Sequence, residues 1–295
     1  MIACIDIGGT SIKAGVLDKN GKIKFRETLK IIDDIDKLFD IIVNFVERSK
    51  RNFLIEGLAI SSPGAVDTKE GVIYGSSALN CIHGPNFKKI LGERLNLNVS
   101  IENDANCAAL AEVFNGSAKD VNNMIFIVCG TGIGGSIVYN GEIINGKNLH
   151  CGEFGFMIME NEDDKFRTFS EISSTISMVT RVKRFYSGDW DGEKIFREAE
   201  CGNMICINAI NKFYLNLAKG IYNLQYMYDP ELILLGGAIS EREDFLDKIN
   251  DNLDYLVNKI ELAKIKPQIR TCTYKKDANL IGALSNFKKE YYLKL

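Results

Sequence analysis

The sequence predicts an α/β protein of two domains, and three observations support this. Apolar strand patterns alternate with amphipathic helical patterns along the whole chain, as in sheets covered by helices. An apolar strand runs into a glycine-rich turn twice, once in each half of the chain. The 295 residues, 46% hydrophobic and 25% charged, suffice for two buried cores. We expect residues 1–117, completed by a C-terminal helix at about 277–295, to form a small N-terminal domain, and residues 118–276 a larger C-terminal domain.

The elements expected in the first half are strands at residues 2–7, 12–17, 22–28, 55–61 and 99–102, and helices at residues 33–50 and 104–114. Asn20-Gly21 separates the second and third strands. Both residues of such a turn favour positive φ, which predicts a two-residue hairpin turn. Asp104 stands at the start of its helix, where an acidic side chain caps free N–H groups.

The second half restarts the same strand and hairpin pattern. The elements expected there are strands at residues 125–129, 136–139, 232–235 and 265–273, and helices at residues 171–186, 204–228, 241–259 and 277–291. Asn140-Gly141 again predicts a hairpin turn. No Pro/Ser-rich linker occurs, so the boundary between the domains is expected to be a hinge near residues 115–122.

Composition excludes several classes of function. The net charge is −3 and the isoelectric point about 5.6, so no basic field favours nucleic acid. No apolar run approaches the roughly 20 residues that span a bilayer, and the chain enters a strand pattern without a signal peptide, which predicts a cytoplasmic protein with no membrane partner. The eight cysteines are scattered without a Cys-x-x-Cys pair, which indicates reduced thiols.

The two glycine turns have the chemistry of phosphate loops. Without Cβ atoms, the backbone N–H groups of Gly8-Gly9-Thr10 and Gly130-Thr131-Gly132 can converge on a phosphate oxygen. Asp6 ends the strand before the first turn, where a carboxylate can hold a phosphate-bound Mg²⁺ through water. One loop of this kind is weak evidence, whereas one per half suggests a duplicated nucleotide clamp.

Four spaced motifs carry a family resemblance. They are Asp6-Ile7-Gly8-Gly9-Thr10, Glu102-Asn103-Asp104-Ala105-Asn106, Gly130-Thr131-Gly132-Ile133-Gly134-Gly135 and Gly152-Glu153-Phe154-Gly155. In this order they resemble the ROK family of bacterial sugar kinases, from residue 2 to about residue 283. The resemblance implies the actin-like ATPase (ribonuclease H-like) fold, with two α/β domains around a central cleft. It also implies ATP and Mg²⁺ as cofactors and a small-molecule sugar as substrate.

The resemblance implies a role for each matching residue. Asp104 would be the catalytic base, which accepts the proton of the sugar hydroxyl as the phosphoryl group arrives. The sugar hydroxyls would be bound by Gly64, Asn80, Asn103, Asp104, Glu153 and Glu171. The nucleotide would be bound by Asp6, Gly8, Gly9, Thr10, Lys13, Gly130, Thr131, Gly132, Gly236 and Gly237.

Ordinary structural roles compete with several of these assignments. Asp104 can serve as a helix cap alone, Lys13 can belong to a solvated strand face, and Glu171 can complement a helix dipole. The loop at Gly64 can be a plain turn, and Gly236-Gly237 can be any strand-to-helix turn. Glu153 lies between Gly152 and Gly155, where the backbone can approach a ligand closely.

The chain departs from the family in one stretch. Many members have a histidine where Phe156 stands, followed by a cysteine cluster that binds structural zinc, whereas residues 157–170 contain no cysteine. Asp163, Asp164 and Lys165 there make no tetrahedral zinc site, so no zinc is expected. His150 and Cys151 are not expected to bind metal. This zinc-less pattern resembles the subgroup with β-glucoside kinases and some N-acetylmannosamine kinases.

We expect ATP-dependent phosphorylation of a hexose or hexosyl sugar at a hydroxyl, the 6-hydroxyl being favoured, by a homodimer that prefers glucose or a β-glucoside. The alternatives are an N-acetylmannosamine kinase and a sugar-binding transcriptional regulator of the family. Such regulators carry a helix-turn-helix before the first glycine turn, where this sequence has only a strand. The fold also permits a cytoskeletal ATPase or an acyl-phosphate-forming kinase.

Overall fold

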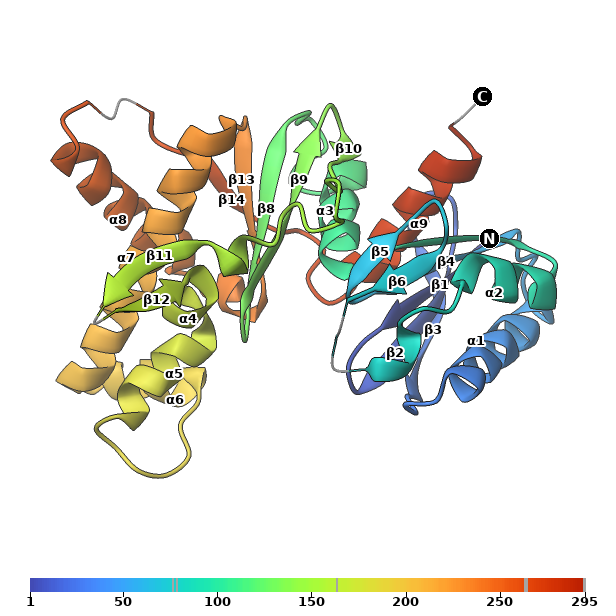
Figure 1. The fold of residues 1–295 in the computed structure, drawn as a ribbon, viewed down its shortest axis with the longest axis horizontal. Helices are drawn as coiled ribbons and strands as arrows, with labels where there is room; N and C mark the ends of the chain where they lie inside the picture. The colour runs from blue at the N-terminus through green and yellow to red at the C-terminus, as the bar shows by residue number, and fades with distance from the viewer. Residues whose placement is uncertain (76, 78, 163, 263–264, 294–295) are drawn as a thin grey trace. The chain divides into compact units, whose positions relative to one another are not determined.

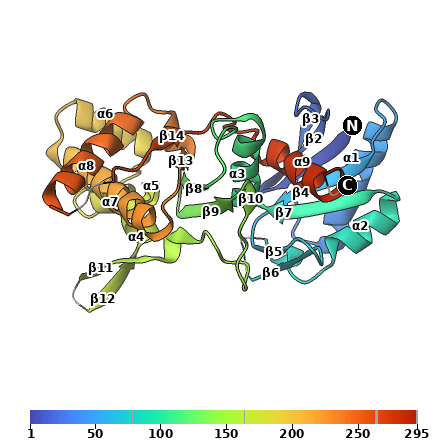
Figure 2. The same ribbon diagram turned by 90° about the horizontal axis from the view of Figure 1, so that it is seen from above.

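A computed structural model describes residues 1–75, 77, 79–162, 164–262 and 265–293 (Figures 1 and 2). Its contacts divide the chain into two compact units. Unit 1 comprises Met1–Lys119, Asn145–His150 and Lys276–Leu295, and unit 2 comprises Asp120–Ile144 and Cys151–Lys275. The segment Asn145–His150 therefore joins unit 1 although both its neighbours in sequence belong to unit 2. No helix among the described residues has the length and apolar character needed to span a membrane.

Unit 1 is built on a five-stranded sheet of order β3-β2-β1-β4-β7. Its strands are β1 (Ile2–Ile7), β2 (Ser11–Leu17), β3 (Ile23–Lys30), β4 (Gly57–Ser62) and β7 (Asn98–Asn103). The first three strands form an antiparallel meander, and β4 and β7 continue the sheet in parallel with β1. All side chains of β1 and β4 are buried, as expected for central strands with both faces covered.

Helices cover both faces of this sheet. On one face, α1 (Ile35–Lys50) and α2 (Phe87–Leu95) bury apolar side chains such as Phe45 and Phe87 against β1 and β4. On the other face, α9 (Ala278–Tyr291) packs on β1, β4 and β7, and α3 (Asp104–Asn115) packs on α9. A Cβ on Gly57 would lie 2.1 Å from a ring carbon of Phe287, so glycine at this position lets α9 approach the sheet.

Unit 2 repeats the arrangement with the order β10-β9-β8-β13-β14. Its strands are β8 (Met124–Cys129), β9 (Ile133–Tyr139), β10 (Glu142–Ile143), β13 (Leu232–Gly236) and β14 (Ile269–Thr271). Three antiparallel strands are again followed by two parallel ones. The α/β prediction is confirmed, and the duplicated glycine turn corresponds to a duplicated sheet topology.

The helices of unit 2 are α4 (Phe169–Ser173), α5 (Thr175–Lys183), α6 (Gly192–Glu200), α7 (Met204–Tyr228) and α8 (Phe245–Lys259). Helix α7 packs on the sheet, and α5, α6 and α8 pack on α7 (Figure 2). The long helix α7 contributes Phe213 and Leu217 to one core with Ile125 and Ile233 of the sheet. A hairpin of β11 (Ile158–Glu162) and β12 (Lys165–Thr168) precedes α4.

Several predictions of local structure are wrong. The single helix expected at residues 171–186 is two helices, because Ser174 is extended (φ −80°, ψ 164°) and its side chain accepts from the Ser177 N–H as the cap of α5. The helix expected from residue 241 begins at Phe245, after a 3-10 turn at Ala238–Glu241. The strand expected at residues 265–273 is only the three-residue β14.

The two Asn-Gly turns also differ from each other. Asn140 and Gly141 both have positive φ (50° and 74°) between β9 and β10, which confirms the second hairpin turn. Between β2 and β3 only Gly21 has positive φ, at 85°. There the Asp18 carboxylate accepts from the N–H groups of Asn20 and Lys22, so a longer loop closed by Asp18 replaces the expected two-residue turn.

Several elements among the described residues were not expected from the sequence. They are α2, α6, β10, the hairpin of β5 (Ala65–Asp67) and β6 (Val72–Tyr74), the hairpin of β11 and β12, and 3-10 turns at Asn80–Ile82, Phe154–Phe156 and Ala238–Glu241. Each helix, strand or turn among them spans at most nine residues, so too few apolar positions repeat for an amphipathic pattern to stand out. The division of the chain into domains at residue 117 stays a prediction.

Candidate functional site

Asp6 of unit 1 lies at the carboxyl end of β1, the edge at which open α/β sheets bind ligands. Its carboxylate is only 5% exposed and accepts from three side chains. The Ser61 hydroxyl of β4 donates to Oδ1 at 3.2 Å, and the Asn279 amide of α9 donates to the same oxygen at 2.9 Å. The Lys13 ammonium of β2 lies 3.3 Å from Oδ2. Two neighbouring strands and α9 thus hold Asp6 in place.

The Asn103-Asp104 pair lies at the same edge, two strands away, where β7 ends and α3 begins. The cap of α3 is Asn103 and not Asp104, which corrects the prediction. The Asn103 Oδ1 accepts from the N–H groups of Ala105 (2.9 Å) and Asn106 (3.1 Å), and its Nδ2 donates to the Gly64 carbonyl at 3.1 Å. Asp104 is the first residue of the helix and half-buried, where the helix dipole stabilises its negative charge.

Behind this pair lies a buried carboxylate. Glu102 is 3% exposed, and its Oε1 accepts from the Asn103 N–H at 2.7 Å and from the Asn106 Nδ2 at 3.0 Å. Burial raises the pKa of Glu102 to about 7. The Asn106 Nδ2 also donates to the Asn145 Oδ1 at 3.2 Å. Glu102 and Asn106 therefore tie the segment Asn145–His150 to the start of α3.

Two further sugar-site candidates of unit 1 lie in loops. Gly64 has a φ of 100°, which favours glycine, and its carbonyl receives the Asn103 amide. Asn80 is exposed and begins the 3-10 turn Asn80–Ile82. The structure therefore brings Gly64 and Asn103 into contact, while the Asn80 side chain makes no hydrogen bond to another described residue.

The two glycine turns are only partly open, because the first N–H group of each already donates within the turn. The Gly8 N–H donates to the Ser11 carbonyl at 3.0 Å, and Gly9 and Thr10 are exposed. The Gly130 N–H donates to the Gly132 carbonyl at 2.9 Å. In unit 2, a Cβ on Gly130 would meet no atom within 4 Å, so the space beside this residue is open. The Gly130 carbonyl accepts from both the N–H (2.9 Å) and the hydroxyl (2.7 Å) of Thr175, which fixes the turn to the start of α5.

Glu153 of unit 2 is exposed and precedes a 3-10 turn at Phe154–Phe156. Its flanking glycines are required for the packing of this loop on β9, and the close approach of the loop to a ligand stays a prediction. A Cβ on Gly152, whose φ is 95°, would lie 2.6 Å from the Gly135 carbonyl oxygen, and one on Gly155 would lie 2.2 Å from that of Ile133. Both glycines let the loop approach β9 closely. Phe156, at the position of the family histidine, is 74% exposed.

Glu171 forms a capping box at the start of α4. Its Oε2 accepts from the Thr168 N–H at 2.7 Å, and its own N–H donates to the Thr168 hydroxyl at 3.4 Å. The hydrogen bond from the Thr168 backbone lowers the pKa of Glu171. The spacing Thr-x-x-Glu in the sequence was the available signal for this box. Glu171 thus has a structural role, and its carboxylate stays exposed.

Gly236 is the last residue of β13 and Gly237 follows it, and Gly237 has a φ of 99°. A Cβ there would lie 2.0 Å from the Cys129 carbonyl oxygen at the end of β8. Gly237 is therefore required for the close approach of this turn to the neighbouring strand, independently of any ligand.

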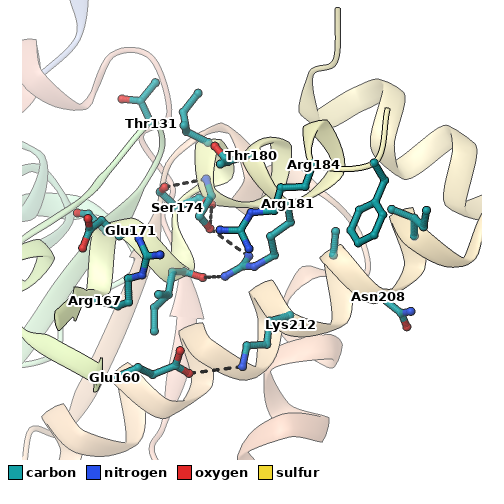
Figure 3. Close-up of a pocket in the computed structure, with 17 residues that line it drawn as sticks. Thr131, Glu160, Arg167, Glu171, Ser174, Thr180, Arg181, Arg184, Asn208 and Lys212 are labelled. Atoms are coloured by element: carbon teal, nitrogen blue, oxygen red, sulfur yellow. Dashed lines mark hydrogen bonds and ion pairs between the residues drawn. The ribbon is translucent and has the colours of Figure 1, made fainter. Parts of the chain in front are cut away.

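Unit 2 contains a cavity of about 730 Å³ between α4, α5, α7 and the β11–β12 hairpin (Figure 3). Thr131 of the second glycine turn and Glu171 both belong to its wall. A proposed nucleotide residue and a proposed sugar residue therefore lie on one cavity. The remaining charged side chains that line it are Glu160, Arg167, Arg181, Arg184 and Lys212.

Within unit 1 the structure gathers Asp6 and Lys13, and separately Gly64, Asn103 and Asp104, on one edge of a sheet. The sequence missed Ser61, Glu102, Asn106, Asn145 and Asn279, which hold these residues. Only Glu102 and Asn106 had a signal, since both lie in the Glu102–Asn106 motif. Among the described residues, no group of three or more His, Cys, Asp or Glu side chains is arranged to hold a metal ion.

Comparison with known proteins shows likeness along nearly the whole chain. Residues 2–290 match the ROK family. The β-glucoside kinase of Listeria innocua is 33% identical over 98% of both chains. A ROK family protein of Streptococcus pneumoniae, solved in complex with sucrose, is 38% identical with a TM-score of 0.91 over 98% of both chains. Lmo2764 of Listeria monocytogenes, a candidate N-acetylmannosamine kinase, is 32% identical with a TM-score of 0.87 over 98% of this chain and 99% of that one.

Proposed function

Because this chain belongs to the ROK family, with its actin-like ATPase fold, we propose that it is a sugar kinase that transfers a phosphoryl group from ATP to a hydroxyl of glucose or a β-glucoside. The 6-hydroxyl is the favoured acceptor. Likeness to a β-glucoside kinase and to a sucrose-bound protein supports a sugar substrate. The observation that carries the proposal is the Asn103-Asp104 pair, which a capped helix start holds at the ligand-binding edge of a sheet.

Asp104 would act as the general base. A sugar hydroxyl is a poor nucleophile, so a carboxylate that accepts its proton lowers the barrier to phosphoryl transfer. The capping bonds of Asn103 fix the backbone from which Asp104 projects. Asn103 would bind a sugar hydroxyl through the second hydrogen of its Nδ2 amide, because its Oδ1 already accepts two hydrogen bonds and its Nδ2 donates one to Gly64. Gly64 and Asn80 would line the same subsite.

The nucleotide would be bound by the two glycine turns. The open space beside Gly130 supports contact between this turn and a phosphate group. Gly8, Gly9, Thr10 and Lys13 would bind phosphate oxygens from unit 1, and Gly236-Gly237 would support the adenosine. Glu153 and Glu171, both exposed, would accept hydrogen bonds from further sugar hydroxyls.

The donor set near Asp6 fits Mg²⁺ only as part of a nucleotide complex. Mg²⁺ is commonly bound by one or two carboxylates together with water and substrate phosphates. Asp6 offers one carboxylate, and Ser61, Asn279 and Lys13 already donate to it. Asp6 would therefore hold the ion through water. When bound, Mg²⁺ supplies charge that neutralises the transferring phosphates.

We further propose that units 1 and 2 are the two domains of the kinase, and that the protein is a cytoplasmic homodimer. Size-exclusion chromatography with light scattering tests the dimer: a mass near 66 kDa supports it, since the chain has a mass of 32.9 kDa. A single peak near the mass of one chain overturns it.

N-acetylmannosamine is the alternative substrate, because Lmo2764 is nearly as similar to this chain as the β-glucoside kinase. A panel of glucose, cellobiose, N-acetylmannosamine, N-acetylglucosamine and fructose, each with ATP and Mg²⁺, distinguishes the two. Fastest turnover of glucose or cellobiose supports the proposal, and fastest turnover of N-acetylmannosamine favours the alternative. Phosphorylation of acetate but of no sugar would overturn the sugar kinase itself.

A further inference from the structure

The cavity of unit 2 has more positive charge than its own carboxylates neutralise. Among the residues that the structure describes, two acidic side chains line it, and both are already engaged. Glu160 pairs with Lys212 at 3.5 Å and with Lys219 at 3.3 Å, and Glu171 accepts from the Thr168 backbone. This leaves three basic side chains, which we call the arginine cluster: Arg167, Arg181 and Arg184. Among the described side chains, no carboxylate lies within ion-pair distance of these three.

Arg181 lies at the centre of the lining between α5 and α7 (Figure 3). Its Nη1 donates to the Ser177 hydroxyl at 3.2 Å, and its Nη2 donates to the Ile172 carbonyl, so both acceptors are uncharged. Burial lowers the pKa of Arg181, and the nearby positive charge of Arg184 lowers it further, opposed by Glu160. A half-buried guanidinium that donates only to uncharged acceptors has lost hydration that a bound anion would replace.

The rest of the cavity suits an organic molecule. Its volume of about 730 Å³ is within the usual range for small-ligand sites. One part of the wall is apolar, from Ile176, Phe185, Ile205 and Ala209. The exposed Thr180 hydroxyl lines another part and can bind a further polar group. The buried Ser177 hydroxyl, in contrast, already donates to the Ser174 carbonyl at 2.7 Å and accepts from Arg181.

We propose that this cavity is a binding site for a phosphate monoester of sugar-phosphate size. The arginine cluster would hold the phosphate, because the planar guanidinium donates two parallel hydrogen bonds to phosphate oxygens. The organic part would lie against the apolar wall and the Thr180 hydroxyl. Thr131 and Glu171 belong to the same wall, so the bound ester would contact two residues of the proposed substrate sites. The inference rests on the cavity and does not require phosphoryl transfer.

Isothermal titration calorimetry without nucleotide tests the site, with glucose 6-phosphate as the probe. The test variant is the double substitution Arg167→Gln and Arg184→Gln. The matched control is Arg197→Gln, which removes the same charge from an exposed position of α6 outside the cavity. We expect the double variant to bind glucose 6-phosphate at least about tenfold more weakly and the control to bind within about twofold of the unchanged protein.

Glucose and inorganic phosphate serve as further probes. Tighter binding of glucose 6-phosphate than of either supports the inference. Binding of inorganic phosphate with equal affinity would overturn it, as would undetectable binding of glucose 6-phosphate at about 10 mM. An unchanged affinity in the double variant would place the ester elsewhere and also overturn it. If the double variant does not fold, the single variant Arg184→Gln replaces it in the binding test. Arg184 is exposed, so its substitution should leave the fold intact.

The result of the ester-binding test can be distinguished from the result of the sugar-phosphorylation panel. Absence of sugar phosphorylation in the substrate panel would overturn the kinase and leave the binding result in force. Active phosphorylation with no loss of ester affinity in the variants would overturn only the arginine site.

Discussion

Lys13 and Asp6 lie directly opposite each other on β2 and β1, with the Lys13 Nζ 3.3 Å from the Asp6 Oδ2. Our sequence-based proposal gave these residues separate tasks, one on a phosphate and one on Mg²⁺. In the structure they form an ion pair in which Asp6 is buried and the Lys13 side chain is 49% exposed. A magnesium ion and the ammonium group would therefore compete for the same carboxylate.

This competition predicts the behaviour of Lys13→Met. We expect the Mg²⁺ concentration for half-maximal activity to fall, because Asp6 no longer has an ammonium partner. We also expect the KM for ATP to rise about tenfold, the usual effect of losing one charged hydrogen bond to phosphate. Steady-state kinetics over a Mg²⁺ series measure both quantities. Lys24→Met is the matched control. The Lys24 ammonium forms an ion pair with the Asp18 carboxylate at 3.0 Å and lies outside the glycine turn Gly8-Gly9-Thr10. Equal changes in the two variants would contradict the prediction.

The proposed base predicts a selective loss of turnover. Asp104→Asn should lower kcat by about 10²- to 10⁴-fold, the usual contribution of a general base. Sugar binding should change only a few-fold, because Asn103 and not Asp104 caps α3. Rapid kinetics and equilibrium sugar binding separate the two effects. A fall in kcat of less than about tenfold would remove Asp104 from the mechanism.

Glu102 predicts a pH dependence of stability. Its pKa is raised by burial to about 7 from a usual value near 4.5, so between these values the folded state binds a proton that the unfolded state has released. The free energy of unfolding should therefore fall as the pH rises from about 4.5 to about 7. Glu102→Gln should remove this dependence and stabilise the protein at pH 8 by at most about 3 kcal/mol.

Urea unfolding at pH 5.5 and pH 8 measures this effect. The exposed Glu93 on α2 offers the control Glu93→Gln, which should leave the pH dependence of the unchanged protein intact. A Glu102→Gln variant with the same pH dependence as the unchanged protein would show that Glu102 does not titrate in this range.

Glu171 has two proposed roles, capping of α4 and sugar binding, and substitution of Thr168 separates them. Glu171→Ala removes both the capping box and a proposed sugar ligand, whereas Thr168→Ala removes the hydroxyl side of the box alone. We expect both variants to melt at lower temperature, because each weakens the cap of α4. Only Glu171→Ala should raise the KM for sugar, by about tenfold. A similar KM in both variants would leave Glu171 with a structural role only.

Metal content provides a further check. Activity should require added Mg²⁺, because this ion neutralises charge on the transferring phosphates. Elemental analysis of the purified protein should find no stoichiometric zinc, since residues 157–170 contain no cysteine. One zinc ion per chain would contradict the interpretation of this stretch.

The sequence by itself determined the elements with a strong apolar pattern. Strand β1 begins and ends where expected because it is a continuous apolar run except at Asp6, and helix α7 because its apolar residues repeat along 25 residues. It also indicated the duplicated glycine turns and their repeated strand-and-hairpin pattern, and the structure adds that the two sheets share one strand order. Local chemistry was sufficient here, since backbone conformation and burial pattern are encoded by neighbouring residues.

Tertiary structure alone decided which polar groups meet. Asn279 reaches Asp6 across 273 positions, and Asn145 reaches Asn106 across 39, so no local pattern could reveal either contact. Likewise, no local pattern indicated that the glycines flanking Glu153 are needed for close packing on β9, because that contact joins separate segments. A sequence encodes what each residue can do, but the distances that select among those roles arise only when distant segments pack together.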